Sequence, residues 1–177
     1  MLADDSPAFD ALQPEIVSLV AAALDELVAT RGREGERLAE MIRSRIQRMR
    51  ELVASVQPRV PALVAEYQEK LATRLRDAAA TLDDDRIRLE VGLFAQRVDV
   101  AEELSRLSTH LDEVERILKV GGAAGKRLDF LMQELNREAN TLGSKAMAAD
   151  MTAIAVELKL AIEQMRGHVA DFPFPRE

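Results

Sequence analysis

The stretch LSRLSTHLDEVERILKVGGAAGKRLDFLMQELNREANTLGSK, residues 104–145, decides the fold. Ahead of its glycines, leucine and valine recur at steps of three, four and seven residues, the spacing of a helix with one apolar face. Behind them a second apolar stripe follows the same period, through Leu128, Leu135 and Leu142. Glycine-rich segments end helices, and short loops join antiparallel neighbours. The stretch therefore predicts a helical hairpin that turns at residues 121–125.

Helical periodicity extends outward from this hairpin over nearly the whole chain. It predicts an all-α fold of extended antiparallel helical hairpins, packed as a coiled-coil-like bundle. A first helix is expected to begin near Pro14, and we expect a break or kink near residues 31–35, because two glycines weaken a helix there. The remaining predicted helices cover residues 38–56, 62–80, 86–120, 126–146 and 150–169.

Composition excludes several classes of protein. The 177 residues carry 24 basic and 31 acidic side chains, a net charge of −7, which argues against non-specific coating of nucleic acid. The absence of cysteine excludes disulfides, thiolate metal sites and a cysteine nucleophile. Aromatic residues make up only 3%, too few for a large sheet. No targeting signal or membrane-length apolar run is visible, so we expect a soluble intracellular protein.

Two carboxylates in the second helix of the hairpin form a candidate metal site. Glu134 and Glu138 lie one turn apart, a spacing that lets both reach one divalent cation through oxygen ligands. The alternative is a solvated, ion-paired face, because Arg137 and Lys145 lie nearby on the same side of the helix.

The helix before the glycines offers a matching polar edge. Its members recur at steps of four, three and four: Asp99, Glu103, Arg106 and His110. Carboxylates and an imidazole on one face suit either metal ligation or acid–base chemistry. A histidine on a charged edge is also commonly a plain surface residue. The predicted hairpin would bring part of this edge towards the two carboxylates of the other helix.

Arginines concentrate between residues 31 and 50, where seven of them occur with only three glutamates. The arginine fork suits phosphate, so this segment is a candidate track for a phosphodiester backbone. The alternative is that these side chains flank an apolar seam and cover it with their stems. The shortage of aromatic residues argues against recognition by base stacking.

Several motifs resemble one known family. Residues 125–141, GKRLDFLMQELNREANT, followed by ELK at 157–159 and IEQMR at 162–166, look like the C-terminal signature of the bacterial YicC/YloC family. Residues 95–110 and 30–35 match the same family, and the resemblance extends from about residue 12 to residue 166. It implies a cytoplasmic, divalent-metal-dependent endoribonuclease that assembles as a hexamer, with Mn²⁺ or Mg²⁺ as cofactor and RNA as substrate. Family members are longer, so the chain resembles their C-terminal helical part.

The resemblance also implies roles for individual residues. The implied catalytic groups are Glu134, Glu138 and His110. The implied metal ligands are Asp99, Glu103, Asp129, Glu134 and Glu138, and the implied RNA-binding residues are Arg97, Lys126, Arg127, Arg137 and Lys145. The chain would divide into the helical end of the family's N-terminal region (1–57), a connecting helix (58–89) and a C-terminal helical domain that carries the signature (90–177). The alternative function is a non-catalytic helical module for oligomerisation or RNA binding.

Overall fold

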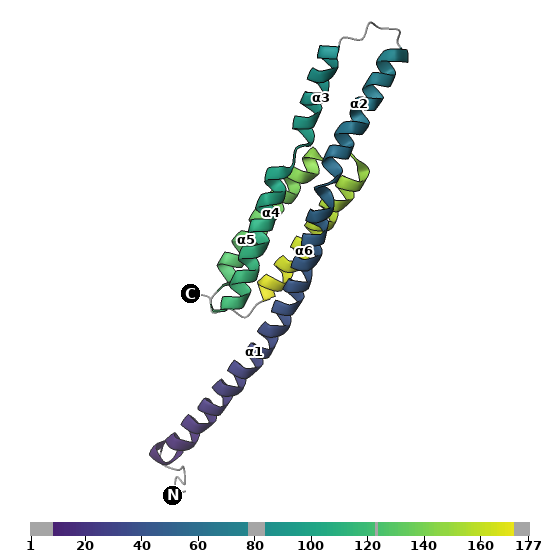
Figure 1. Ribbon diagram of the computed structural model, residues 1–177. Helices are drawn as coiled ribbons and strands as arrows, with labels where there is room; N and C mark the ends of the chain where they lie inside the picture. The colour runs from purple at the N-terminus through teal and green to yellow at the C-terminus, as the bar shows by residue number, and fades with distance from the viewer. Residues whose placement is uncertain (1–8, 78–83, 123, 172–177) are drawn as a thin grey trace, which may run out of the picture.

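The fold is built from α-helices. The computed structural model describes residues 9–77, 84–122 and 124–171, and every regular element in those ranges is a helix. The elements are α1 (Phe9–Val56), α2 (Arg59–Asp77), α3 (Asp84–Val98), α4 (Ala101–Val120), α5 (Gly125–Lys145) and α6 (Ala149–Asp171). Figure 1 shows long helices side by side, and the all-α prediction is confirmed. None of the described helices is both long and apolar enough to cross a membrane.

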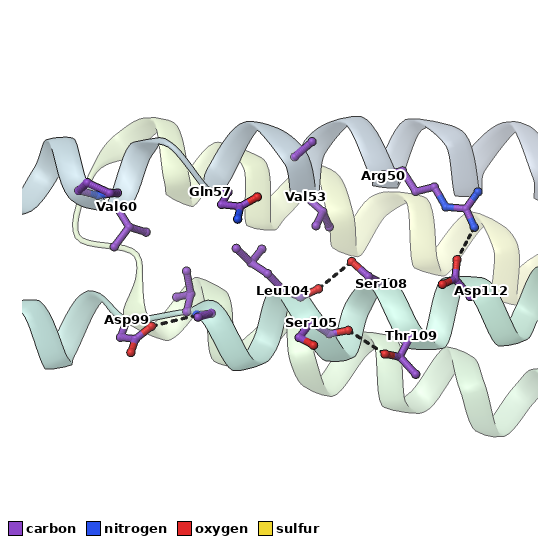
Figure 2. Close-up of a pocket in the computed structure, with 14 residues that line it drawn as sticks. Arg50, Val53, Gln57, Val60, Asp99, Leu104, Ser105, Ser108, Thr109 and Asp112 are labelled. Carbon is purple, nitrogen blue, oxygen red and sulfur yellow. Dashed lines mark hydrogen bonds and ion pairs between the residues drawn. The ribbon is translucent and has the colours of Figure 1, made fainter.

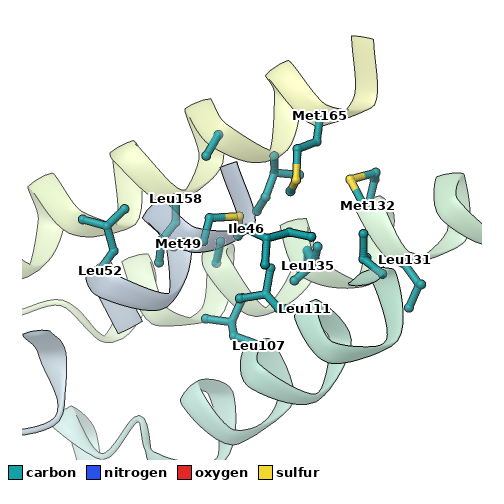
Figure 3. Packing of buried hydrophobic residues seen from close by; sticks show 14 of the residues in the cluster. Ile46, Met49, Leu52, Leu107, Leu111, Leu131, Met132, Leu135, Leu158 and Met165 are labelled. Atoms are coloured by element: carbon teal, nitrogen blue, oxygen red, sulfur yellow. The ribbon is translucent and has the colours of Figure 1, made fainter. Parts of the chain in front are cut away.

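The core is a four-helix bundle formed by the C-terminal half of α1 with α4, α5 and α6 (Figure 1). Within it, α5 packs against both α4 and α6. Leucine, isoleucine and methionine fill the space between the helices, and Figure 3 shows Met49 of α1, Leu111 of α4 and Leu135 of α5 meeting there. Burying one such side chain contributes roughly 1.5–3 kcal/mol, so this core fixes how α4 and α5 lie against each other.

The predicted break near residues 31–35 is wrong. Helix α1 begins at Phe9, so Pro14 lies inside it, and it continues through both glycines of that segment to span 48 residues, about 72 Å. Each glycine costs about 1 kcal/mol relative to alanine, and the arginine, glutamate and leucine residues around them are good helix formers that outweigh this cost. The N-terminal half of α1 extends beyond the bundle (Figure 1), and apolar side chains on it, such as Leu24, are exposed.

A second difference lies between α3 and α4. Periodicity predicts one helix over residues 86–120, but the structure divides it at Asp99. Val98 and Val100, on either side of the break, are both buried. The Asp99 carboxylate accepts a hydrogen bond from a backbone amide in the first turn of α4 at 3.0 Å. The backbone carbonyl of Asp99 accepts a hydrogen bond from the ammonium of Lys145 at 2.9 Å. A contact with α5 thus accompanies the break, and helical periodicity does not reveal it.

Helices α2 and α3 form a hairpin that projects from the bundle (Figure 1). The rings of Tyr67 and Phe94 stack across it, with their centroids 4.0 Å apart. The segment 58–89, predicted as one connecting helix, thus holds α2 and the first part of α3, and residues 78–83 lie outside the described part of the chain. The division of the chain into three regions stays a prediction.

Candidate functional site

The α4–α5 hairpin carries most of the residues that the sequence singles out. Its turn lies where predicted, and Gly121 and Gly122 adopt positive φ angles of 71° and 81°, a region that favours glycine. Three ion pairs cross between the two helices along one edge: Glu103 with Lys145, Arg106 with Glu138, and Glu113 with Arg127. We call this edge the α4–α5 seam.

Glu103 lies at the end of the seam that is farthest from the turn, and only 5% of its surface is exposed. Its Oε1 atom accepts a hydrogen bond from Lys145 Nζ at 2.7 Å. Its Oε2 atom is buried and has no hydrogen-bond partner among the described residues. Leaving a buried acceptor unsatisfied costs free energy, so this oxygen is suited to bind a water, a cation or another ligand.

Glu138 is the second buried carboxylate of the seam, with 3% of its surface exposed. Its Oε1 atom lies 3.4 Å from the guanidinium of Arg106, which also pairs with Glu102. The charge of Glu102, followed by the hydrogen bond to Glu138, raises the pKa of Arg106, so the guanidinium stays protonated. Arg106 follows Glu103 by three residues, about 4.5 Å of helix rise. The two buried carboxylates therefore belong to successive ion pairs along the seam.

Glu134 and His110 extend the seam towards the turn. Glu134 lies one turn before Glu138, has a side chain that is 18% exposed and pairs with Arg137 at 3.3 Å. His110 lies one turn after Arg106 and is half-buried. It falls between two of the ion pairs that cross the seam, so the structure places it on the same edge as the predicted catalytic carboxylates.

Two of the predicted metal ligands differ in their relation to the seam. Asp129 is displaced from Glu138 by about 180° around α5, at 100° per residue, and it approaches Arg166 of α6 at 4.0 Å. Asp99 lies at the end of the seam, where its backbone carbonyl shares the ammonium of Lys145 with Glu103, but its carboxylate accepts a hydrogen bond from a backbone amide of α4. The five implied ligands are therefore not gathered in one place within this chain, because helix geometry turns Asp129 away from the seam.

The donor chemistry of the seam can be compared with what a divalent cation requires. Among the described residues, no three aspartate, glutamate or histidine side chains converge closely enough to hold a metal ion. Mg²⁺ commonly binds through only one or two carboxylates, and waters and substrate phosphates complete its coordination. Either buried carboxylate could serve as such a ligand, Glu103 through its unpartnered oxygen, but each is already paired with a cation, Lys145 for Glu103 and Arg106 for Glu138.

Most of the predicted RNA-binding residues already contact acids. Ion pairs on the hairpin hold Lys145, Arg137 and Arg127. Arg97 and Lys126 lie at the end of α3 and the start of α5, and both are exposed. Because carboxylates balance much of this positive charge, the five residues alone do not form an uninterrupted basic surface.

A cavity of about 710 Å³ lies between α4 and α1 rather than on the seam (Figure 2). The hydroxyls of Ser108 and Thr109 on its wall donate to carbonyls of their own helix. At one end Arg50 pairs with Asp112 at 2.6 Å, and both are labelled in Figure 2. These four side chains thus have partners within the fold, and among the implied site residues only Asp99 lines this cavity.

Comparison with known proteins decides the family. Residues 56–172 match the model of the family described as "Endoribonuclease YicC-like, C-terminal". The chain belongs to this YicC-like family. It is 47% identical over 160 residues to the probable endoribonuclease YicC of Haemophilus influenzae, and 32% identical over 150 residues to that of Clostridioides difficile. These matches cover 90% and 83% of this chain but 56% and 51% of the relatives, so the YicC-like chain spans about half the length of the curated relatives it matches.

Sequence motifs assign no role to one residue of the YicC-like seam. Arg106 bridges the two helices by pairing with Glu102 on α4 and Glu138 on α5. Its signal in the sequence is its position between Glu103 and His110, on the same polar edge. This position alone does not predict the partner of Arg106. The partner follows from the register of the hairpin, which places Glu138 opposite Arg106.

Proposed function

We propose that this YicC-like chain cleaves RNA as a divalent-metal-dependent endoribonuclease, with its chemistry at the α4–α5 seam. One observation carries the proposal: Glu103 and Glu138 are buried carboxylates at a helix interface, in a chain whose relatives are named as probable endoribonucleases. Buried polar atoms in proteins almost always have hydrogen-bond partners. The Oε2 atom of Glu103 has none among the described residues, which favours a ligand at the seam.

Each group of the seam has a role under this proposal. Glu103 and Glu138 would hold Mn²⁺ or Mg²⁺ through their oxygens, with Glu134 one turn farther along α5. The cation would stabilise negative charge on the phosphoryl oxygens and lower the pKa of a water molecule. His110 would accept or donate a proton, because histidine is the side chain most often used for general acid–base catalysis. The predicted RNA-binding residues, Arg97 among them, would contact the RNA backbone.

A cleavage assay tests the proposal. We expect the 177-residue chain to cut a single-stranded RNA internally in the presence of Mn²⁺ or Mg²⁺, and to produce no fragments in EDTA. The measurement is product length on a denaturing gel over time. Cleavage that persists in EDTA would contradict the dependence on a metal ion. RNA binding with no fragments under any condition would favour the non-catalytic alternative.

A second function, assembly with copies of itself, is supported by the N-terminal half of α1. Val20, Leu24 and Leu27 form an apolar ridge on this helix, and each is more than half exposed. Monomeric proteins rarely leave a contiguous apolar surface of this kind uncovered. We therefore propose that this ridge mediates homo-oligomers, up to the hexamer that the family resemblance implies, and that the protein works in the cytoplasm.

Charge on the ridge should prevent this assembly. We expect Leu24→Glu/Leu27→Glu to shift the molar mass from an oligomer to a monomer, because carboxylates cannot be buried unpaired in an apolar interface. The measurement is light scattering coupled to size-exclusion chromatography. Ala22→Glu/Ala29→Glu is the matched control, since it adds the same charge on the other side of the helix and should leave the mass unchanged. A wild-type chain that is already a monomer would rule out the ridge as a self-association surface.

A further inference from the structure

A groove of about 380 Å³ lies where α1 leaves the bundle, at the end of the α4–α5 hairpin that holds the turn. Its floor is apolar and includes Ala39, Ile117 and Leu128. Arg31 and Arg43 of α1 lie on its rim, and the rim also carries one acid, Glu36. The groove is separate from the cavity of Figure 2 and shares no residue with the buried carboxylates of the seam.

The two arginines on the rim form no ion pairs with other described parts of the fold. Arg48 and Arg50, farther along α1, pair with carboxylates of the bundle. Arg31 and Arg43, in contrast, have no ion pair with any described residue, although both are exposed beside a cavity. The structure thus divides the arginine-rich segment into one group that stabilises the bundle and another that is available to a ligand.

Glycines keep the groove open. Gly32 lies inside α1, where glycine costs about 1 kcal/mol relative to alanine. A side chain there would meet no atom within 4 Å, so close packing does not require the glycine. Gly121 and Gly122 in the turn also line the groove, but their positive φ angles already account for glycine there. At Gly32, a side chain would occupy space that a ligand could fill.

The start of α5 adds a favourable field for an anion. Its N-cap residue, Ala124, lines the groove and provides no side-chain hydrogen bond to the first amides of the helix. The first turn of α5 contains no acidic residue. Amides at a helix start carry partial positive charge and bind anions such as phosphate.

We infer that this groove binds one nucleotide unit of a single-stranded RNA. Arg31 and Arg43 hold its phosphates through charge-assisted hydrogen bonds, and the base lies over the apolar floor. The volume lies at the lower end of the range for small-ligand pockets, about 300–1,000 Å³, which suits a single unit. The inference deepens the proposed function, on which it rests for the identity of the ligand as RNA.

The position of the groove predicts which kinetic constant it controls. Ten residues of α5 separate Ala124 from Glu134, about 15 Å of helix. A nucleotide in the groove therefore lies away from any bond that is cut at the seam. Loss of the groove contacts should weaken binding and raise KM, while kcat stays close to that of the wild type.

Binding in EDTA tests the groove without the cleavage reaction. The probe is a fluorescent single-stranded RNA, and its Kd is measured by anisotropy over a range of salt concentrations. We expect Arg31→Gln/Arg43→Gln to weaken binding at least tenfold. The slope of log K against log salt should fall by about 1.4, since each lost phosphate contact on a single strand removes about 0.7. The matched control, Arg33→Gln/Arg37→Gln, removes the same charge from the same helix outside the groove and should leave the slope nearly unchanged.

A steric variant gives an independent result. Gly32→Leu should fill the groove and weaken RNA binding at least tenfold without lowering the melting temperature, because leucine is the better helix former. Gly92→Leu is its control, since Gly92 is also a helical glycine whose side chain would meet no atom within 4 Å, and it lies on α3. Unchanged Kd in the Gly32 variant would overturn the inference.

The possible failures can be told apart. Equal losses in both pairs of arginine variants would show general attraction by α1 and would overturn a specific groove. Metal-dependent cleavage with wild-type Kd and KM in the groove variants would overturn the inference and leave the proposed function intact. RNA binding that depends on the groove, without any cleavage, would support the inference and contradict the endoribonuclease proposal. A wild-type chain that binds no RNA would contradict both.

Discussion

Replacing Lys145 with methionine should lower the free energy of unfolding by about 3 kcal/mol. The ammonium lies 2.7 Å from Oε1 of Glu103, whose side chain is 7% exposed. Without it, the carboxylate would be buried with no partner at either oxygen. Breaking a buried ion pair in this way costs about 3–5 kcal/mol, and we expect the lower end because the Lys145 side chain is itself 33% exposed. For a chain of this length, the melting temperature should fall by about 6–12 °C.

Denaturant unfolding and calorimetry measure this effect, and two further variants isolate its cause. Glu103→Leu/Lys145→Met should recover most of the lost stability, because replacing both members of a buried pair with apolar groups is often neutral. Lys119→Met is the matched control, since Lys119 pairs with Glu115 at 3.1 Å on an exposed surface. Such pairs contribute about 0–1 kcal/mol. A Lys145→Met loss no larger than that of Lys119→Met would show that the pair does not hold the seam together.

The hairpin at the centre of this protein could be predicted because its signals are local. Leu128, Leu135 and Leu142 mark an apolar stripe at helical spacing, and two glycines with positive φ end the preceding helix. The same periodicity places Glu103 and Glu138 on the polar edges of their helices. Family membership is likewise visible in the sequence, because the motif at residues 125–141 is long and has no gap, and the family comparison confirms it.

The remaining features depend on contacts between elements. The helix break at Asp99 is accompanied by burial of Val98 and Val100 and by a hydrogen bond from Lys145, which is 46 residues away in the chain. The separation of Asp129 from the seam follows from helix geometry, but its neighbour on α6 does not. Sequence also cannot divide the arginines of α1, because Arg48 and Arg50 find their acids only after the bundle has formed. A charged residue that pairs with another helix stabilises the bundle. A charged residue without such a pair can bind a ligand.

The strongest expected effect on activity is that of Glu138→Gln, which should lower the rate of metal-dependent RNA cleavage at least a hundredfold. Glutamine keeps the size of the side chain and removes the negative charge that would hold the cation. The fold should tolerate the change, because Arg106 keeps Glu102 as a partner. Losing a general acid or base commonly costs about 10²- to 10⁴-fold, and we expect the loss of a metal ligand to be of similar size. The measurement is the single-turnover cleavage rate in Mn²⁺, with circular dichroism to verify the fold.

The variant Asp129→Asn tests which residues bind the metal ion. The structure places Asp129 away from the α4–α5 seam, whereas the family resemblance implies that it is a metal ligand. Asp129 and Glu138 both lie on α5, and both are implied metal ligands. Asp129, however, lies on the side of α5 that faces α6, near Arg166. We therefore expect Asp129→Asn to cleave RNA at close to the wild-type rate and Glu138→Gln to be nearly inactive. Equal losses would mean that both faces of α5 serve the reaction, which one chain cannot achieve at a single cation because the two carboxylates are about 180° apart around the helix. Such a result would require Asp129 to act at a second site or towards a neighbouring protomer, and it would move the proposed reaction away from the α4–α5 seam alone.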